Sequence, residues 1–593
     1  MPSILLIVGA LLLAATLIYP YRLIRNFYYA KRANVPYVVI PFDQDATLWM
    51  VLSVPLRPVI QRWLPTWLKD RLLITIWGWE FHESSKPFER WGKPMGNNKT
   101  MAWVTAGLFE INSWDAEFAT EVLKRPKDFQ EPHFNTIFVG RFGHNILTTN
   151  GEHWARQRKI MAQVVNERIS KVVFNETVQQ THGLLEEVFE HGEKTTADTY
   201  SAFDMMKKIT IHVLSGAGMG KPVSWSGNDE TPGAGYKMTY MDASKTVMEG
   251  MAGPIILPQW LFDNYPSFLP GYGYIKRLGC AVREYPLHTK AILDAERERV
   301  KQPGEMASSN IVSQMLQASE GVRAGTGLTE SEMVGNLFIF TAAGFDTTAN
   351  TLSYALAVLA WEPKWQTWIF AEIDEIMPQD RNAELDYASI FPKAIRVMAL
   401  MLETLRLYTP LVHIPKATYG EQTVTTSKHT YRLPHNTTIY INAIALHKDP
   451  AVWRDLNRRE KDKPTDLPDE DVFRPTRWIN DDGKLFQPAK GTYLPWSAGP
   501  RNCPGMKMAQ VEFTATILTI FRAHKIAAVP LQIPDPGVPG LGTREESLEE
   551  VQQRIAARVK DSLSILTLQM NNVYDVTKSS GESLGIKLRF SRR

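Results

Sequence analysis

The 593-residue sequence contains very little cysteine: Cys280 and Cys503 are the only two. Two cysteines are too few for a disulfide framework or a cysteine-rich zinc site. A solitary cysteine is most often a small buried apolar residue, and less often a nucleophile or a metal ligand. The residues around each cysteine must therefore decide what it does.

The sequence also lacks a strong excess of charge of one sign. It contains 66 basic and 63 acidic residues, a formal net charge of +3. This charge is too small to argue for nucleic acid as a partner, so none is expected. An internal repeat, a glycine-rich nucleotide-binding motif and a flavin domain are likewise missing from the sequence.

The N-terminal segment predicts a membrane anchor. Residues 4–19 carry no charge and are nearly all Leu, Ile, Val and Ala. The charged residues that follow are all basic: Arg22, Arg25, Lys31 and Arg32. A cleavable signal peptide has the opposite order, with its basic residues first. We predict a single-pass signal anchor over residues 1–21 in the endoplasmic reticulum, with the main chain in the cytosol. A buried core helix is the alternative.

Beyond the anchor, the apolar periodicity predicts a mainly α protein with small β-sheets. The clearest helices are expected near residues 150–165, 168–190, 200–216, 282–300, 329–360, 387–407 and 504–523. Strand-like runs are fewer: Thr438–Ile444, Leu563–Gln569 and Ile586–Phe590. Residues 455–500 fit neither pattern and are predicted to form an ordered meander. We expect a basic, proline-containing linker over residues 22–45 and one large domain over residues 46–593.

Residues 251–275 are apolar and aromatic although they include four prolines. Such a segment can be an internal core loop. It can equally be a surface patch that dips into the membrane beside the anchor. The sequence leaves both interpretations open.

Cys503 lies in the segment Trp496-Ser-Ala-Gly-Pro-Arg-Asn-Cys-Pro-Gly505, directly before a helical run. Gly499 permits a turn with positive φ, and Pro504 suits a helix start because its missing N–H is not needed there. The helix N-terminus would direct N–H groups toward the sulfur and lower the thiol pKa. Arg501 could pair with a haem propionate. The arrangement favours an iron-binding thiolate over a buried structural cysteine.

The same segment resembles the haem-binding loop of the cytochrome P450 family, F-x-x-G-x-R-x-C-x-G. The resemblance implies that Cys503 is the axial ligand of the iron of haem b, with Arg501 and Gly505 in the cofactor-binding loop. Trp496 stands where the family usually has phenylalanine, and an indole can still cover the proximal face of the haem. The implied fold is the cytochrome P450 fold, a single large domain that encloses the haem.

Glu403 and Arg406 lie on the predicted helix over 387–407, and their i, i+3 spacing places both on one helix face. In the resembled family an arginine of the meander completes this ion pair. The segment Phe473-Arg-Pro-Thr-Arg477-Trp478 matches that part of the family, so Arg477 is implied as the third member. The network is expected to hold the haem-binding loop rather than to do chemistry. Glu296 and Arg299 have the same spacing, which we interpret as chance.

The predicted helix over 329–360 contains Ala343-Gly344-Phe-Asp346-Thr347-Thr348, a group of poor helix formers at mid-helix. It resembles the family's oxygen-activation motif, [AG]-G-x-[DE]-T-[TS]. The resemblance implies a groove for dioxygen at Ala343 and Gly344. It also implies catalytic roles for Thr347, which would hydrogen-bond dioxygen, and for Asp346, which would relay protons. Packing of small residues is the alternative.

Two further segments resemble the family. Trp154 and Arg158 match its W-x-x-x-R motif, whose members contact the haem propionates. His447 lies in a segment that precedes the meander, and we interpret it as structural rather than as an iron ligand.

Substrate contacts are predicted in Phe129–Phe138, Phe338–Ala342 and Leu411–Ile414, which are largely apolar and include His413. The individual candidates are Phe134, Phe138, Phe338, Ala342, Leu411 and Val412. The predicted substrate is a bulky lipophilic small molecule of terpenoid, steroid, polyketide or alkaloid type.

The resemblance implies a monooxygenase that inserts one oxygen atom from O2 into this substrate. Since no flavin domain is visible, NADPH-derived electrons are expected through a separate NADPH–cytochrome P450 reductase, with cytochrome b5 as a further candidate partner. Arg156, Lys159 and Lys507 are candidate docking residues, and a solvated charged surface is the alternative.

The motifs are most similar to those of fungal members, which predicts a role in secondary metabolism. A haem-thiolate isomerase or dehydratase that needs no reductase is one rival function. A non-catalytic haem-binding membrane protein is the other. The intact Asp346–Thr347 pair disfavours both.

Overall fold

The computed structural model describes residues 2–40, 46–132, 140–227, 231–250, 253, 257–300, 310–320, 327–380, 383–454, 468–534, 542–564, 566–570 and 586–593. Its first helices are α1 (Pro2–Arg32), α2 (Thr47–Trp63), α3 (Thr66–Leu73), α4 (Trp79–Glu83), α5 (Ala116–Leu123), α7 (Gly151–Val164), α8 (Glu167–Val188), α9 (Ala202–Val213), α10 (Tyr240–Glu249), α12 (Gln259–Asn264) and α13 (Tyr272–Val300). The later helices are α14 (Ile311–Glu320), α15 (Glu330–Trp361), α16 (Lys364–Ile376), α17 (Tyr387–Ile390), α18 (Ile395–Leu407), α19 (Ala443–Leu446), α20 (Pro450–Trp453), α21 (Met506–Ala523) and α22 (Leu548–Lys560).

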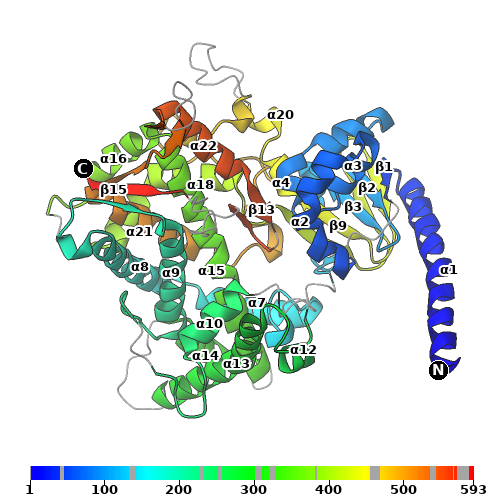
Figure 1. Cartoon of the computed structure of the whole chain (residues 1–593), viewed down its shortest axis with the longest axis horizontal. Helices are drawn as coiled ribbons and strands as arrows, with labels where there is room; N and C mark the ends of the chain where they lie inside the picture. Colours follow the sequence, from blue (N-terminus) through cyan, green and yellow to red (C-terminus); the bar gives the residue numbers. More distant parts are fainter. Residues whose placement is uncertain are drawn as a thin grey trace.

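Helix α15 runs through the middle of the helical body (Figure 1). It begins at a capping box, in which Thr329 Oγ1 accepts from the backbone N–H of Glu332 and Glu332 accepts from that of Thr329. Most of its residues are buried, and it packs against α9, α18, α21 and α22. A helix that is apolar on all sides belongs in a protein core, where this one organises the others.

The largest sheet has six strands in the order β1-β2-β3-β9-β6-β4. Its strands are β1 (Tyr37–Val39), β2 (Thr100–Val104), β3 (Glu110–Ser113), β4 (Phe129–Gln130), β6 (His413–Thr418) and β9 (Thr438–Asn442). The pairs β1–β2 and β3–β9 are parallel, and the other neighbours are antiparallel. The sheet lies on one side of the molecule with α2, α3 and α4 (Figure 1).

The smaller sheets are β10-β15-β5, β7-β8, β11-β12 and β13-β14. Their strands are β5 (Thr196–Thr199), β7 (Gln422–Thr425), β8 (Thr430–Leu433), β10 (His524–Ala528), β11 (Gln532–Pro534), β12 (Thr543–Glu545), β13 (Ser562–Ser564), β14 (Leu568–Met570) and β15 (Leu588–Arg592). The fold is therefore mainly helical with small sheets, as the periodicity predicted.

The predicted helices and strands agree with those of the structure, except in the following places. The predicted helix over 387–407 is divided into α17 and α18 by a 3-10 turn at Phe391–Lys393, which contains Pro392. The predicted strand Thr438–Ile444 ends at Asn442, because the Asn442 side chain caps α19 by accepting from Ala445 N–H. The predicted strand Leu563–Gln569 is wrong: it is the antiparallel pair β13–β14. The meander is described from residue 468 onward.

Within the predicted linker over 22–45, residues up to 32 are helical and residues 37–39 form a strand. Helix α1 continues to Arg32, and Asn26 donates hydrogen bonds of 2.9 Å to the carbonyls of Thr105 and Gly107. Strand β1 then joins the six-stranded sheet. The side chains of α1 are described from Leu17 onward, so those of the predicted anchor before it lie outside the described residues. Among the residues that were described, no helix is both long enough and apolar enough to cross a bilayer.

In the segment 251–275, residues 253 and 257–275 are described, and much of this part lies on the surface. Trp260 is 64% exposed and Phe268 is 84% exposed, whereas Phe262 is buried. An internal core loop would bury such side chains. The described part is therefore a surface patch with one buried anchor residue.

Candidate active site

A cavity of about 450 Å³ lies between α15, α21, β6 and the loop that contains Cys503. Apolar side chains make up much of its wall: Ile146, Leu147, Leu214, Ile339, Phe340, Leu405, Leu411, Val412, Ile414 and Leu566. A cavity of this size with few polar groups is typical of a site for a small molecule or cofactor.

The cysteine loop contributes Trp496, Arg501, Cys503 and Gly505 to this wall. Gly499 has a φ of +69°, and a Cβ there would lie 2.3 Å from the carbonyl oxygen of Leu123, so only glycine fits. This confirms the predicted turn. Helix α21 begins at Met506, directly after the loop.

The helix N-terminus lowers the pKa of Cys503 as predicted, but burial outweighs this effect. Burial raises the pKa of the thiol, whereas the backbone N–H groups of Gly505 and Met506 and the charge of Arg158 lower it. A bound metal cation would favour the thiolate over the thiol.

Cationic side chains line one side of the cavity. Arg158 donates a 2.6 Å hydrogen bond to Asn502 Oδ1, which connects α7 to the cysteine loop. Arg501 lies with its guanidinium 4.4 Å from the ring centre of Trp154 and donates to Asn150 Oδ1 at 2.7 Å. Lys416 of β6 adds a third cation to the wall. The structure thus brings Trp154, Arg158, Arg501 and Cys503 together.

Helix α15 contributes five residues to another part of the cavity wall: Ala343, Gly344, Thr347, Thr348 and Thr351. Thr347 Oγ1 donates to the carbonyl of Ala343 at 2.8 Å. Gly344 lies close to α9: a Cβ there would be 3.1 Å from Leu214 Cδ2. Small side chains at these positions therefore leave room in the cavity and between the helices.

Asp346 lies outside the cavity wall, one residue before Thr347. Burial raises its pKa to about 6, with the charge of Lys207 on α9 lowering it and that of Glu249 on α10 raising it. The carboxyl group is therefore placed between the cavity helix and two charged groups of neighbouring helices. This position suits a predicted proton relay but not direct contact with a ligand.

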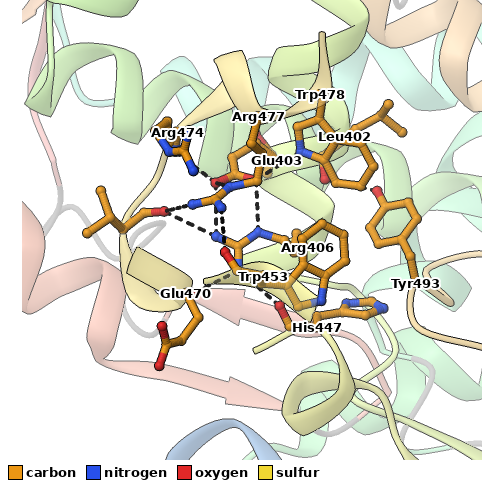
Figure 2. A network of polar contacts seen from close by, with 12 residues as sticks. Leu402, Glu403, Arg406, His447, Trp453, Glu470, Arg474, Arg477, Trp478 and Tyr493 are labelled. Carbon is orange, nitrogen blue, oxygen red and sulfur yellow. Dashed lines mark hydrogen bonds and ion pairs between the residues drawn. The ribbon is translucent and has the colours of Figure 1, made fainter. Parts of the chain in front are cut away.

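The carboxylate of Glu403 is the centre of a buried network (Figure 2). Glu403 and Arg406 are both fully buried, and Arg406 donates to both carboxylate oxygens at 2.8 and 2.9 Å. The same carboxylate accepts from Arg477 Nε at 3.0 Å, from the backbone N–H of Arg474 at 2.7 Å and from Trp478 Nε1 at 2.9 Å. These donors hold the pKa of Glu403 at about 2 against the effect of burial.

The network extends from α18 through the meander to His447 and Tyr493 (Figure 2). Arg406 also donates to the carbonyls of His447, Glu470 and Val472. His447 Nε2 accepts from the backbone N–H of Leu494 at 2.8 Å, and Tyr493 donates to the carbonyl of Leu402 at 2.9 Å. Burial lowers the pKa of His447 to about 3, so the ring is neutral. His447 is structural, as the sequence indicated.

The predicted substrate contacts fall into three groups. Leu411 and Val412 line the cavity. Phe338 and Ala342 do not: Phe338 stacks on Phe142 at a centroid distance of 4.0 Å inside the core. Phe134 and Phe138 lie outside the described residues. On α15, the cavity instead receives Ile339 and Phe340.

Sequence reasoning missed several residues of the wall, including Trp77, Lys416, Glu512 and Ser564, whereas Glu131 lies within the predicted segment Phe129–Phe138. Trp77 and Ser564 come from segments without a recognisable motif. A charged residue within an alternating strand, such as Lys416 in β6, was the available signal, because such a residue requires a partner.

The proposed docking residues are not equally available. Arg156 forms an ion pair with Glu332 and donates to the carbonyl of Gly327, which ties α7 to the start of α15. Lys507 lies 3.6 Å from Glu167 and 4.3 Å from the ring centre of Phe391, and it is 39% exposed. Arg156 is therefore a structural residue, and Lys507 remains a candidate.

Residues 111–548 match the cytochrome P450 family. A phomenoic acid biosynthesis cluster cytochrome P450 monooxygenase of Leptosphaeria maculans is 38% identical over 515 residues, which cover 84% of this chain and 87% of that protein. A cytochrome P450 monooxygenase of Arthrobotrys oligospora is 27% identical over 573 residues, covering 91% and 92%. The crystal structure of a cytochrome P450, CYP102L1, matches with a TM-score of 0.59 at 17% identity, over 86% of this chain and 94% of that one.

The chain belongs to the cytochrome P450 family and is a cytochrome P450 monooxygenase. The family implies a haem-thiolate centre, and the cavity fits one. Cys503 supplies a thiol in the cavity wall, and Arg158, Arg501 and Lys416 supply cations for two propionates. Arg501 Nε and Ser497 Oγ are buried without a hydrogen-bond partner in the described part of the chain, which leaves polar atoms for a cofactor.

We expect Arg406→Lys to prevent stable assembly of the haem-binding domain. Lysine lacks the planar guanidinium, so it cannot serve both Glu403 and the carbonyls of His447, Glu470 and Val472. Disrupting a buried ion pair should lower the free energy of unfolding by about 3–5 kcal/mol. Urea unfolding and the Soret absorbance per mole of protein measure the two effects.

Arg299→Lys is the matched control, because Glu296 and Arg299 have the same spacing and a 2.6 Å contact on a helix. The Arg299 side chain is 29% exposed, so the change should be about 1 kcal/mol or less. Equal losses in the two variants would contradict a special role for the Glu403 network.

Glu512 gives a pH-dependent prediction. Burial raises the pKa of this cavity-lining carboxyl group to about 8, with a hydrogen bond from Thr210 lowering it. Between its ordinary pKa of about 4.3 and 8, the folded protein keeps a proton that the unfolded chain has lost, so stability falls as pH rises. We expect Glu512→Gln to reduce this fall by about 2 kcal/mol between about pH 6 and pH 8.

Urea unfolding at several pH values measures this slope. Glu549→Gln, which removes an exposed carboxylate of α22, is the control and should leave the slope unchanged. Identical slopes in wild-type protein and Glu512→Gln would show that Glu512 is not buried in its neutral form.

Proposed function

We propose that this enzyme oxidises a lipophilic small molecule in fungal secondary metabolism. The observation that carries the proposal is one apolar cavity lined by both the Cys503 thiol and the Thr347 hydroxyl. The similarity of the chain to a Leptosphaeria maculans enzyme of the phomenoic acid biosynthesis cluster supports a role in secondary metabolism. A terpenoid, steroid, polyketide or alkaloid would each fit the apolar wall.

The residues of the cavity wall would have two roles, to hold the haem and to orient the substrate. Cys503 would hold haem b through its thiolate, and Trp154, Arg158 and Arg501 would hold the propionate edge. When bound, haem supplies the reductive activation of O2 and the oxidation of the substrate C–H bond. Apolar side chains such as Ile339 and Leu411 orient the substrate and exclude water.

Protons would reach the cavity through α15. Thr347 places a hydroxyl in the wall, and its proton can turn from the Ala343 carbonyl toward a ligand. Asp346, with a pKa of about 6, can exchange a proton near neutral pH. Lys207 and Glu249 are the charged groups that would connect it to solvent.

We also propose a separate NADPH–cytochrome P450 reductase as the electron donor and the endoplasmic reticulum membrane as the location. The apolar run 4–19 and the basic residues after it support a single-pass anchor with the catalytic domain in the cytosol. The exposed side chains of Trp260 and Phe268 support contact of a second segment with lipid.

The function is tested with the full-length chain in microsomes that contain a fungal reductase. We expect a red-shifted Soret band in the reduced, CO-bound protein, and products of lipophilic precursors that carry one oxygen atom from isotopically labelled O2. Product formation should require NADPH and the reductase, and mass spectrometry detects the label. Product without NADPH would instead indicate an isomerase or dehydratase, and Cys503→Ala should abolish the band.

Thr347→Ala tests the proposed proton pathway. We expect the red-shifted Soret band to persist while the product formed per NADPH falls about ten-fold and hydrogen peroxide rises, because a proton donor is lost from the cavity. Thr341→Ala is the matched control, since Thr341 makes the same i−4 hydrogen bond on α15 but lies outside the cavity wall. Unchanged coupling in Thr347→Ala would contradict the assignment.

A further inference from the structure

Strand β6 contributes two basic side chains to the cavity wall, and each is held by a buried carboxylate from elsewhere in the chain. Lys416 forms an ion pair with Glu131, and both side chains are less than a tenth exposed. His413 Nδ1 lies 2.7 Å from Glu80 Oε1. The Glu131–Lys416 pair is close to Arg501, whose Nη1 lies 3.8 Å from Glu131 Oε1.

Glu80 is an unusual residue for its position. It lies on the short helix α4, it is 2% exposed, and its second oxygen, Oε2, has no hydrogen-bond partner in the part of the chain that the structure describes. A buried carboxylate that serves only one histidine is expensive to retain for stability alone. Such a carboxylate is more often kept to fix the orientation of its partner.

Helix α4 is held firmly against the cavity. Gly78 precedes it with a φ of +77°, and a Cβ there would lie 2.6 Å from Ser564 Cβ, so the two backbones are in close contact. His82 forms a 2.8 Å hydrogen bond with the carbonyl of Ser562 on β13, and Figure 1 shows α4 beside that strand. Trp77, two residues before the helix, lines the cavity itself.

The imidazole of His413 is thereby oriented on two sides. Glu80 Oε1 lies 2.7 Å from Nδ1 in a charge contact without hydrogen-bond geometry, and the ring of Tyr440 packs edge-on at a centroid distance of 4.8 Å. His413 is among the residues that line the cavity, and with Glu80 beside Nδ1 the other ring nitrogen, Nε2, is the one that could meet a ligand there. A histidine whose Nδ1 is held by a carboxylate presents Nε2 in a fixed orientation and, when protonated, as a charged donor.

We propose that Glu80 is a positioning residue that holds His413 so that its Nε2 donates to a carboxylate group in the cavity. This inference rests on the proposed function, which places a haem in the cavity. The carboxylate belongs either to the haem or to an acidic substrate. The neighbouring cations Arg158, Arg501 and Lys416 make the same wall favourable for an anion.

The proposal gives the N-terminal region a role in the site. Trp77 and Glu80 precede residue 111, where the match to the family begins. The segment that contributes them contacts both β13 and the cavity, so it joins the wall of the site from outside the matched region.

The test uses the purified full-length haem protein and compares Glu80→Gln, His413→Leu and the double variant Glu80→Gln/His413→Arg. Glutamine keeps the size of Glu80 and removes its charge. Arginine brings a permanent charge and several donors, so it does not depend on Glu80. Haem loss is measured as the rate of transfer to excess apomyoglobin, and acid binding by spectral titration with hexadecanoic acid and its methyl ester.

If the haem supplies the carboxylate, Glu80→Gln and His413→Leu should each accelerate haem loss about ten-fold, because a hydrogen bond to a charged group is removed. If the substrate supplies it, haem loss should stay unchanged. Hexadecanoic acid should then bind about ten-fold more weakly, whereas its methyl ester should bind as before. In both cases Glu80→Gln/His413→Arg should restore the wild-type value.

Glu83→Gln is the matched control, because Glu83 lies on α4, is similarly buried, and lies 3.9 Å from Arg57 rather than beside a cavity residue. The proposal is overturned if Glu80→Gln changes neither haem loss nor acid binding relative to Glu83→Gln. It is also overturned if arginine at position 413 fails to rescue, since Glu80 would then act through packing. A wild-type protein without the red-shifted Soret band would instead contradict the proposed function.

Discussion

The structure around the cavity depends on one buried charge, the carboxylate of Glu403. Removing such a group from water is strongly unfavourable, and only a complete set of donors can offset it. Those donors come from α18 and from the meander, which are about 70 residues apart in the chain: Arg474 N–H is 71 positions from Glu403 and Trp478 Nε1 is 75. The meander has little regular structure, so hydrogen bonds to this carboxylate hold it in place, as backbone hydrogen bonds would in a helix or sheet.

Hydrogen bonds that involve the backbone connect the Glu403 network to the loop that contains Cys503. The Glu403 network bonds the meander to α18. Tyr493 donates to the carbonyl of Leu402 on α18, and the backbone N–H of Leu494 donates to His447. The chain then continues through Trp496 to Cys503, and Leu494, Trp496 and Cys503 all line the cavity. None of these contacts uses the thiol itself. The contacts that position the loop are therefore independent of the thiol, which suits a preorganised metal site.

Around the cavity, burial and charge act in opposite directions. Desolvation raises the pKa of Cys503, Asp346 and Glu512, while the carboxylate of Glu131 offsets part of the positive charge of Lys416 and Arg501. A cavity for an apolar substrate must be dry, yet a site for a charged cofactor and for protons must hold ionisable groups. Perturbed titration at such positions is typical of functional sites.

The sequence predicted best those residues whose relation is local. Glu403 and Arg406 share a helix face, and Gly499 needs positive φ, so spacing and residue type were informative. Arg477 required the family resemblance because it is distant in sequence. The face of α15 that lines the cavity was misjudged at Phe338, because a helix that is apolar all round has no polar side to set its phase.

The pairs made by Glu80 and Glu131 could not be predicted from sequence at all. Each joins segments separated by roughly 300 residues, with 285 positions between Glu131 and Lys416, and no motif marks either acid. The pair β13–β14 was missed for a different reason. Both strands have three residues, too few for an alternating pattern to show where one ends.

The continuation of α1 into the folded body affects how the protein can be shortened. Asn26 is fully buried and caps two carbonyls of the loop between β2 and β3, and Ala30 and Ala33 are buried in the core beside that sheet. Cutting the chain within residues 22–45 would therefore remove interior residues and expose the edge of β2 once β1 is lost. A shortened enzyme that keeps its sheet intact has to retain the chain from about Leu23.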